Sequence, residues 1–228
     1  MVWKLGQLLA KMERAQVPGT GRGQCPCRPT TLTGPEACLD PDGVPDVMRG
    51  EEVQAIGVIA AHGEEITMIC HPGTHSKHIA IRDGSIIGFT THLTGELFAV
   101  LCEHSILGRT MTAGPVDWEA FDEGIARSKD AGGLLHHLFG ARTRVLMGGL
   151  STTREADYLS GILIGHEIVT GEGDEPIAIV GAPELAERYL RAYRALGRTA
   201  RTLSAEAATA SGLRLIWDLS AADPSQSG

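Results

Sequence analysis

One hairpin restricts the folds open to this chain more than any other feature. In the stretch SKHIAIRDGSIIGFTT, residues 76–91, Ile79 and Ile81 alternate with other residues, and β-rich residues return after Asp83-Gly84. An Asp-Gly pair between two such runs is a preferred two-residue hairpin turn. The apolar run ITMIC, residues 66–70, comes shortly before it and predicts a buried strand. We therefore expect three consecutive strands between residues 66 and 91.

Helices and further strands surround these three strands. Residues 51–60 predict a helix that has Glu51 and Glu52 in its first turn, and residues 93–107 predict one with Thr94 as N-cap. Residues 108–129 read as a polar region. A helix is expected at residues 152–169, where Thr152 and Glu155 form a capping-box pattern. In this helix Gly161 and Gly165 allow another backbone to come close.

The last third of the chain alternates strand and helix. Residues 176–197, PIAIVGAPELAERYLRAYRALG, predict a strand, a tight turn and a helix that stops at Gly197. A further strand and a helix over residues 205–219 are expected to follow. Three antiparallel strands followed by strand–helix units predict an α/β fold, a mixed sheet with helices on both faces. This is the pattern of a ribonuclease-H-like domain, the unit that is duplicated in the actin-like ATPase superfamily, and the chain has room for one copy.

Proline and glycine divide the chain into regions. Six of the eleven prolines fall between residues 17 and 46, with many glycines between them. Such a segment can bury little apolar surface. We expect an irregular Pro/Gly-rich N-terminal segment over residues 1–44, the ribonuclease-H-like domain over residues 45–218, and a disordered tail over residues 219–228.

Charge and cysteine content exclude several classes of protein. The net charge of -8 disfavours binding to a nucleic acid backbone. No apolar run approaches the length that spans a membrane. Five cysteines, an odd number, do not form a disulfide framework in a chain of 228 residues. A cytoplasmic protein is expected.

The segment CHPGTHSK, residues 70–77, offers two kinds of chemistry. A Gly-Thr turn at Gly73 and Thr74 presents backbone N–H groups and a hydroxyl to phosphate oxygens, and Lys77 adds a positive charge. The alternative is a metal site that uses Cys70 and the nearby histidines 71, 75 and 78. Because neighbouring residues on a strand point to opposite faces, convergence of these four is not natural.

Carboxylates near two predicted helix starts are further candidates. Glu51 and Glu52 follow a glycine in MRGEE, and Glu96 lies in TGEL. They either complement the helix dipole or take part in chemistry, Glu51 as a general base for an attacking hydroxyl and Glu96 as a ligand of a polyol or a metal ion. The VGAPEL turn, which contains Gly181 and Ala182, allows close approach of a flat ligand.

Several of these motifs, in this order, resemble one family of sugar-acid kinases. They are DVMRGEEVQAIG, HPGTHSKH, LTGELFAVLCEHSIL, MGGLSTTREADYLSGILIGHEI and IVGAPELAERYLRAY, which together run from about Pro45 to Trp217. They resemble the 2-dehydro-3-deoxygalactonokinases of the actin-like ATPase superfamily. The resemblance implies ATP and Mg²⁺ as cofactors and transfer of the γ-phosphoryl group to the 6-hydroxyl of 2-dehydro-3-deoxy-D-galactonate in galactonate catabolism.

The resemblance also implies roles for individual residues. Glu51 stands where the catalytic base is expected, and the Gly73–Thr74 turn with Lys77 forms a phosphate-binding loop. The sugar acid is expected to meet Glu52, His75 and Glu96. Gly181 and Ala182 correspond to the adenosine-binding turn. With the loop assigned to phosphate, we expect no metal site within the protein.

One part of the family pattern is missing from this sequence. Family members begin with a first ribonuclease-H-like domain that carries an Asp-x-Gly-Thr/Ser loop, and no such loop precedes Pro45. The resemblance therefore implies an N-terminally truncated chain. It leaves two hypotheses, an active kinase, in which homo-oligomerisation could supply the missing half, and a catalytically incomplete remnant. The metal-binding reading of the histidine-rich segment is the third.

Overall fold

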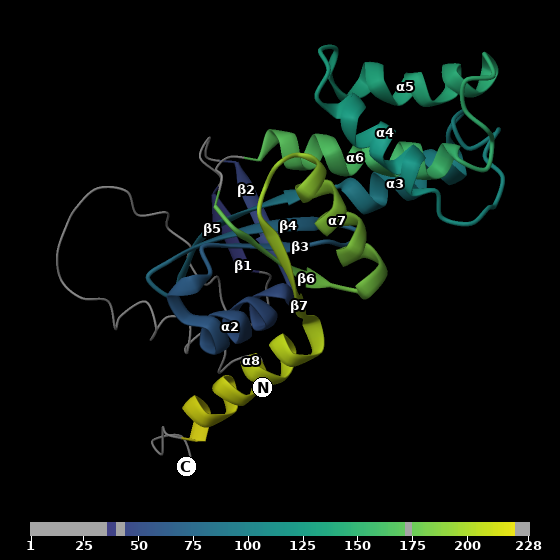
Figure 1. Ribbon diagram of the computed structural model, residues 1–228. Helices are drawn as coiled ribbons and strands as arrows, with labels where there is room; N and C mark the ends of the chain where they lie inside the picture. Colours follow the sequence, from purple (N-terminus) through teal and green to yellow (C-terminus); the bar gives the residue numbers. More distant parts are fainter. Residues whose placement is uncertain (1–35, 40–43, 172–174, 222–228) are drawn as a thin grey trace.

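The computed structural model describes residues 36–39, 44–171 and 175–221 and is built on a five-stranded sheet (Figure 1). The strand order is β5-β4-β3-β6-β7. β4 is antiparallel to both β3 and β5, whereas β6 is parallel to both β3 and β7. The predicted mixed sheet is thus confirmed. Its strands are β3 (Met68–His71), β4 (Ser76–Arg82), β5 (Ser85–His92), β6 (Ile177–Gly181) and β7 (Ala200–Ser204).

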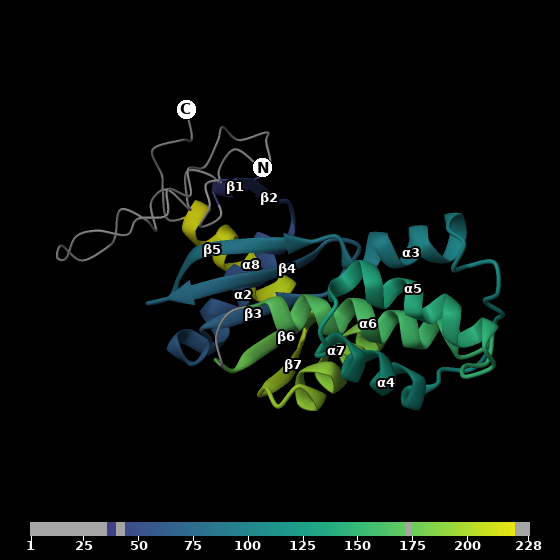
Figure 2. The same ribbon diagram turned by 90° about the horizontal axis from the view of Figure 1, so that it is seen from above.

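Helices cover both faces of this sheet. One face carries α2 (Glu51–His62) and α8 (Ala205–Ala221), and the other carries α6 (Glu155–Thr170) and α7 (Pro183–Ala195). Figure 2 shows a further group of helices beyond one end of the sheet. This group packs against α6 and consists of α3 (Thr94–His104), α4 (Trp118–Ser128) and α5 (Gly133–Leu146). A short 3-10 turn, Gly63–Glu65, follows α2.

Alternation along the central strands separates two apolar layers. In β3, Ile69 packs under α2 and α8, whereas Cys70 faces α6 and α7. In β6, Val180 lies in the first layer and Ile179 in the second. Because successive side chains point to opposite faces of the sheet, a short and continuously apolar strand contributes side chains to both apolar layers.

Local signals in the sequence placed several elements correctly. The hairpin turns at Asp83 and Gly84, whose φ angles are 50° and 69°, as a two-residue turn of this kind requires. A β-carbon on Gly161 would lie 2.1 Å from the carbonyl oxygen of Phe121, so α4 and α6 approach as closely as the glycine pattern predicts.

Other expectations were wrong or lie outside the described residues. The region read as polar contains α4, in which the Asp117 carboxylate accepts a hydrogen bond from the Ala120 N–H at 2.8 Å. The predicted capping box at Thr152 does not form, because α6 begins only at Glu155, whose carboxylate accepts a hydrogen bond from Thr110.

The segment expected to be irregular, residues 1–44, contains one strand, β1 (Glu36–Leu39). It pairs antiparallel with β2 (Pro45–Met48), and the pair lies next to the main sheet. Residues 1–35, 40–43 and 222–228 lie outside the described part of the chain, so the proposed domain boundaries stay predictions. Within the described residues, no helix is long and apolar enough to cross a membrane.

Candidate active site

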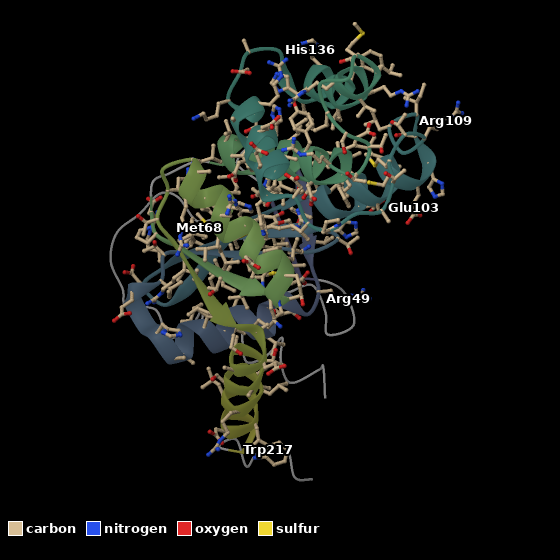
Figure 3. The ribbon with its side chains drawn as sticks, turned by 45° about the vertical axis from the view of Figure 1, so that its right-hand side comes forward. Arg49, Met68, Glu103, Arg109, His136 and Trp217 are labelled. Atoms are coloured by element: carbon tan, nitrogen blue, oxygen red, sulfur yellow. The ribbon has the colours of Figure 1, made fainter. Side chains whose placement is uncertain are left out.

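Several chain segments meet at one end of the sheet. β3 ends at His71, β6 ends at Gly181 and β4 begins at Ser76, so the Pro72–His75 loop lies at this edge. The start of α2 reaches the same edge, because the Glu51 carboxylate lies 3.6 Å from the Lys77 ammonium. Figure 3 shows Arg49, which precedes α2, well away from Met68 at the opposite end of β3.

The turn at Gly73 and Thr74 is held by the first residues of α3. The Glu96 N–H donates to the Thr74 carbonyl at 2.9 Å. A β-carbon on Gly95 would lie 2.3 Å from the Gly73 carbonyl oxygen, so this close approach requires glycine. His75 and Glu96, both half-exposed, contact each other at 2.5 Å between Nε2 and Oε2. The structure thus brings together four of the residues that the sequence indicated.

Lys77 and Glu51 form an ion pair at the base of the loop. Lys77 is only 5% exposed, and its ammonium also lies 3.5 Å from the His75 carbonyl, to which it donates. In this structure the lysine therefore holds the Glu51 carboxylate and the loop backbone together. Contact of Lys77 with a phosphate stays a prediction.

His71, the last residue of β3, lies beside the same ion pair, since it is opposite Lys77 in the β3–β4 register. Its Nδ1–H donates to the Val180 carbonyl at 3.1 Å, which connects the ends of β3 and β6. Burial lowers the pKa of His71 to about 4, although the nearby Glu51 carboxylate opposes this shift. The ring is therefore neutral at physiological pH.

Glu52 differs from its neighbour Glu51 in its surroundings. Its side chain is buried, and its Oε2 accepts a hydrogen bond from the Gly50 N–H at 2.5 Å. This contact satisfies a backbone donor just before α2. A role of Glu52 in binding the sugar acid stays a prediction.

The predicted adenosine-binding turn adjoins the loop. Gly181 ends β6, Ala182 is the N-cap of α7, and Pro183 is the first residue of that helix. A β-carbon on Gly181 would lie 3.3 Å from the Pro72 ring, so the turn and the loop are in contact. Three helices, α2, α3 and α7, therefore begin around one loop.

A cavity of about 160 Å³ opens beside Gly73, between α3, α6 and α7. Its walls are mainly apolar and include Phe98, Leu163 and Leu185. Arg188 also lines it, and one nitrogen of its guanidinium donates to Asp157 at 2.7 Å. The other terminal nitrogen is buried and has no hydrogen-bond partner among the described residues.

Behind the loop lies a buried polar network that no local motif indicated. Its centre is Glu167 of α6, which is 4% exposed. One carboxylate oxygen accepts from Ser76 and contacts His78 Nε2, both at 2.7 Å, and the other accepts from Thr94 and Tyr189. The prediction that Thr94 is the N-cap of α3 was therefore wrong. Thr94 donates to this carboxylate, and the N-cap is Leu93.

The charges in this network stabilise each other. Burial alone would lower the pKa of His78, but the Cys70 sulfur and the Glu167 carboxylate raise it to about 10. For Glu167, burial alone would raise the pKa of the carboxyl group. The hydrogen bond with His78 and its positive charge outweigh the effect of burial, so the pKa of Glu167 is lowered. The pair is therefore an imidazolium and a carboxylate.

The structure separates the four residues of the metal-binding reading. His71 bonds the Val180 carbonyl and His75 contacts Glu96, so each has its own partner. Only Cys70 and His78 come together, at 3.9 Å between Sγ and Nε2. They are opposite each other in the β3–β4 register, which places both side chains on one face.

Comparisons with known proteins agree with these motifs. A profile of the family described as 2-keto-3-deoxy-galactonokinase matches residues 34–216. The "Probable 2-dehydro-3-deoxygalactonokinase DgoK1" of Rhizobium meliloti is 36% identical in an alignment of 190 residues that covers 77% of this chain and 61% of that protein. The "2-dehydro-3-deoxygalactonokinase" of Escherichia coli is 31% identical in an alignment of 186 residues that covers 80% of this chain and 63% of that protein.

A solved structure described as a "putative 2-dehydro-3-deoxygalactonokinase protein from Sinorhizobium meliloti" superposes with a TM-score of 0.71. It is 32% identical, and the match covers 81% of this chain and 64% of the other. The chain thus spans between 61% and 63% of the length of the two curated relatives.

Proposed function

Because this chain belongs to the 2-keto-3-deoxy-galactonokinase family, we propose that it is a sugar-acid kinase that transfers a phosphoryl group from ATP to the 6-hydroxyl of 2-dehydro-3-deoxy-D-galactonate. The observation that carries the proposal is the Gly73–Thr74 turn, around which α2, α3 and α7 all begin. Helix N-termini and free backbone N–H groups favour anions such as phosphate. The proposal includes galactonate catabolism in the cytoplasm.

The nucleotide would lie across the loop and the neighbouring cavity. Phosphates on the Gly73–Thr74 turn would leave the base beside Gly181 and Ala182, close to the cavity lined by Leu185. The apolar walls suit a flat ring, and the unpaired guanidinium nitrogen of Arg188 offers a hydrogen-bond donor. In this arrangement the proposed phosphate and adenosine motifs, which are distant in sequence, would bind one nucleotide.

Glu51 is the proposed general base. Its carboxylate lies at the start of α2, and the 3.6 Å contact with Lys77 holds it beside the phosphate loop. In the proposed reaction it takes the proton of the sugar 6-hydroxyl as that oxygen bonds the γ-phosphorus and ADP leaves. His75 and Glu96, which contact each other at the mouth of the loop, are the proposed partners of the sugar acid, together with Glu52.

Magnesium fits the chemistry of this edge, where the carboxylates of Glu51 and Glu96 offer hard oxygen ligands. Bound with ATP, the ion supplies charge neutralisation at the phosphates.

A second candidate function is nucleotide binding without phosphoryl transfer. The match with the two curated relatives covers 61% and 63% of their length, so part of each relative lies outside it. Phosphoryl transfer depends on accurate positioning of both substrates. A chain that binds ATP but does not position the sugar acid would be a catalytically incomplete remnant of such a kinase.

Calorimetric titration of the chain with ATP and magnesium tests the proposed site. Thr74→Ala should weaken binding about tenfold or more, because a hydrogen bond to a charged group contributes about 1.5–3 kcal/mol. Thr67→Ala is the matched control, since Thr67 is exposed just before β3 at the opposite end of the sheet. Equal affinities of the two variants, or a folded chain that does not bind ATP, would refute the site. Binding without turnover would favour the remnant.

A further inference from the structure

We propose that Cys70, His78 and Glu167 form a buried site for one divalent transition-metal ion, with zinc as the best match. Their ligand atoms, a sulfur, an imidazole nitrogen and a carboxylate oxygen, all lie within 4.8 Å of one another. Thiolate, imidazole and carboxylate are the groups that bind zinc in proteins. This site goes beyond the proposed kinase activity and does not depend on it.

The sheet itself creates the first half of the site. Antiparallel pairing of β3 and β4 places Cys70 opposite His78, and both side chains point toward α6. The separation of 3.9 Å between Sγ and Nε2 is close to the roughly 3.6 Å edge of a tetrahedron with ordinary Zn–S and Zn–N bonds. Two of the ligands are therefore preorganised by backbone hydrogen bonds.

Glu167 supplies the third ligand from α6. Its Oε1 contacts His78 Nε2 at 2.7 Å. A metal ion bound between these two atoms would replace the hydrogen bond and slightly increase the distance between them. The other oxygen is oriented by the hydroxyls of Thr94 and Tyr189. Such hydrogen bonds to a ligating carboxylate are a common feature of metal sites, where they fix the direction of the ligand.

Tyr193 of α7 adds a polar group at the same place. This side chain is fully buried, and its hydroxyl has no oxygen or nitrogen hydrogen-bond partner among the described residues. Its neighbour is the Cys70 sulfur, so the hydroxyl faces the cluster. Sulfur is a weak hydrogen-bond acceptor, and a water bound to the ion would give the hydroxyl a stronger partner.

The ligand set also selects the kind of metal. A thiolate is a soft ligand and favours zinc over magnesium or calcium, which prefer oxygen ligands alone. The ion would replace the thiol proton of Cys70 and the proton between His78 and Glu167. Because Ser76 and Thr94 bond the same carboxylate, the ion would also brace the strand that leaves the phosphate loop and the first turn of α3.

Cobalt(II) titration of the chelator-treated full chain tests the site, because a thiolate bound to cobalt gives a charge-transfer band in the near ultraviolet. The experiment uses a background in which Cys25, Cys27 and Cys38 are serine, so that Cys70 and Cys102 are the remaining thiols. We expect one equivalent of cobalt to produce the band, zinc to displace it, and the metal to raise the melting temperature.

Variants assign the band to its ligands. Cys70→Ser and His78→Gln should each remove it, whereas Cys102→Ser, which changes the half-buried thiol of α3, should keep it. The His78 variant decides the matter if Cys70→Ser does not fold, as judged by circular dichroism. The proposal is overturned if folded chain gives neither band nor thermal shift, or if the band survives both ligand substitutions. Neither outcome affects the ATP titration, so the two proposals fail separately.

Discussion

Gly95→Ala is the substitution whose effect follows most directly from the contact between α3 and the loop that contains Gly73 and Thr74, the proposed phosphate loop. The new methyl carbon would lie 2.3 Å from the Gly73 carbonyl oxygen and 2.8 Å from the Thr74 α-carbon, whereas such contacts are essentially never shorter than 3.0 Å. Both neighbours are backbone atoms, so the loop itself must move away. Overpacking of this kind costs about 1–3 kcal/mol, and the better helix propensity of alanine returns at most about 1 kcal/mol.

We therefore expect urea denaturation to show a loss of about 1–2 kcal/mol in the free energy of unfolding. The shifted loop should also weaken ATP binding at least tenfold in calorimetry, because small displacements in such sites are costly. Gly140→Ala is the control, since this helical glycine of α5 has open space around it and should gain about 0.5–1 kcal/mol. A Gly95→Ala chain with unchanged stability and ATP affinity would refute the close-contact argument.

Two further predictions concern buried charges. Glu167→Gln should lower the free energy of unfolding, measured in urea, by about 3–5 kcal/mol, because it leaves the buried His78 without its ion-pair partner. The control Glu187→Gln, at an exposed position, should change it by less than about 0.5 kcal/mol. Equal losses in the two variants would contradict the stabilising role of the Glu167–His78 pair. His71 has a folded-state pKa of about 4, below its ordinary value of 6.5, so the unfolded chain binds the proton more readily. Stability should fall by up to about 3 kcal/mol as pH drops from about 6.5 to about 4. His71→Asn should flatten this dependence, and a variant profile as steep as that of the original chain would exclude His71 as its source.

Short-range signals explain the parts of the fold that the sequence predicted well. The Asp83-Gly84 turn needs two left-handed residues, and Gly161 is required where α4 crosses α6. Each of these requirements concerns one or two adjacent residues, so it can be recognised in the sequence without knowing the rest of the fold. The strands and the helix at residues 183–195 followed from equally local periodicity.

The parts that were missed depend on contacts between distant segments. Glu167 lies 73 residues or more from Thr94, Ser76 and His78, so no spacing rule connects them. α4 had a readable signal, because Phe121 and Ile125 are four residues apart and follow a good N-cap at Asp117. Its surface is otherwise polar, and burial against α6 decides its structure.

For the candidate site too, the residues in local motifs were predicted, whereas the contacts between distant segments were not. Glu51, Gly73, Thr74 and Gly181 were predicted as site residues from motifs, and the structure places them at one edge of the sheet; their roles stay predictions. The ion pair between Lys77 and Glu51 and the neutral state of His71 arise from packing of α2 on the strand ends, which no motif encodes.

ADP release from magnesium-ATP in the presence of 2-dehydro-3-deoxy-D-galactonate is the measurement that tests the kinase proposal most directly. Glu51→Gln is the active-site variant, and Glu65→Gln, an exposed change just before β3 at the opposite end of the sheet, is the matched control. The account predicts turnover that requires the sugar acid, is lost in Glu51→Gln and persists in Glu65→Gln. Folded protein that binds ATP but releases no ADP, or full activity in Glu51→Gln, would contradict it.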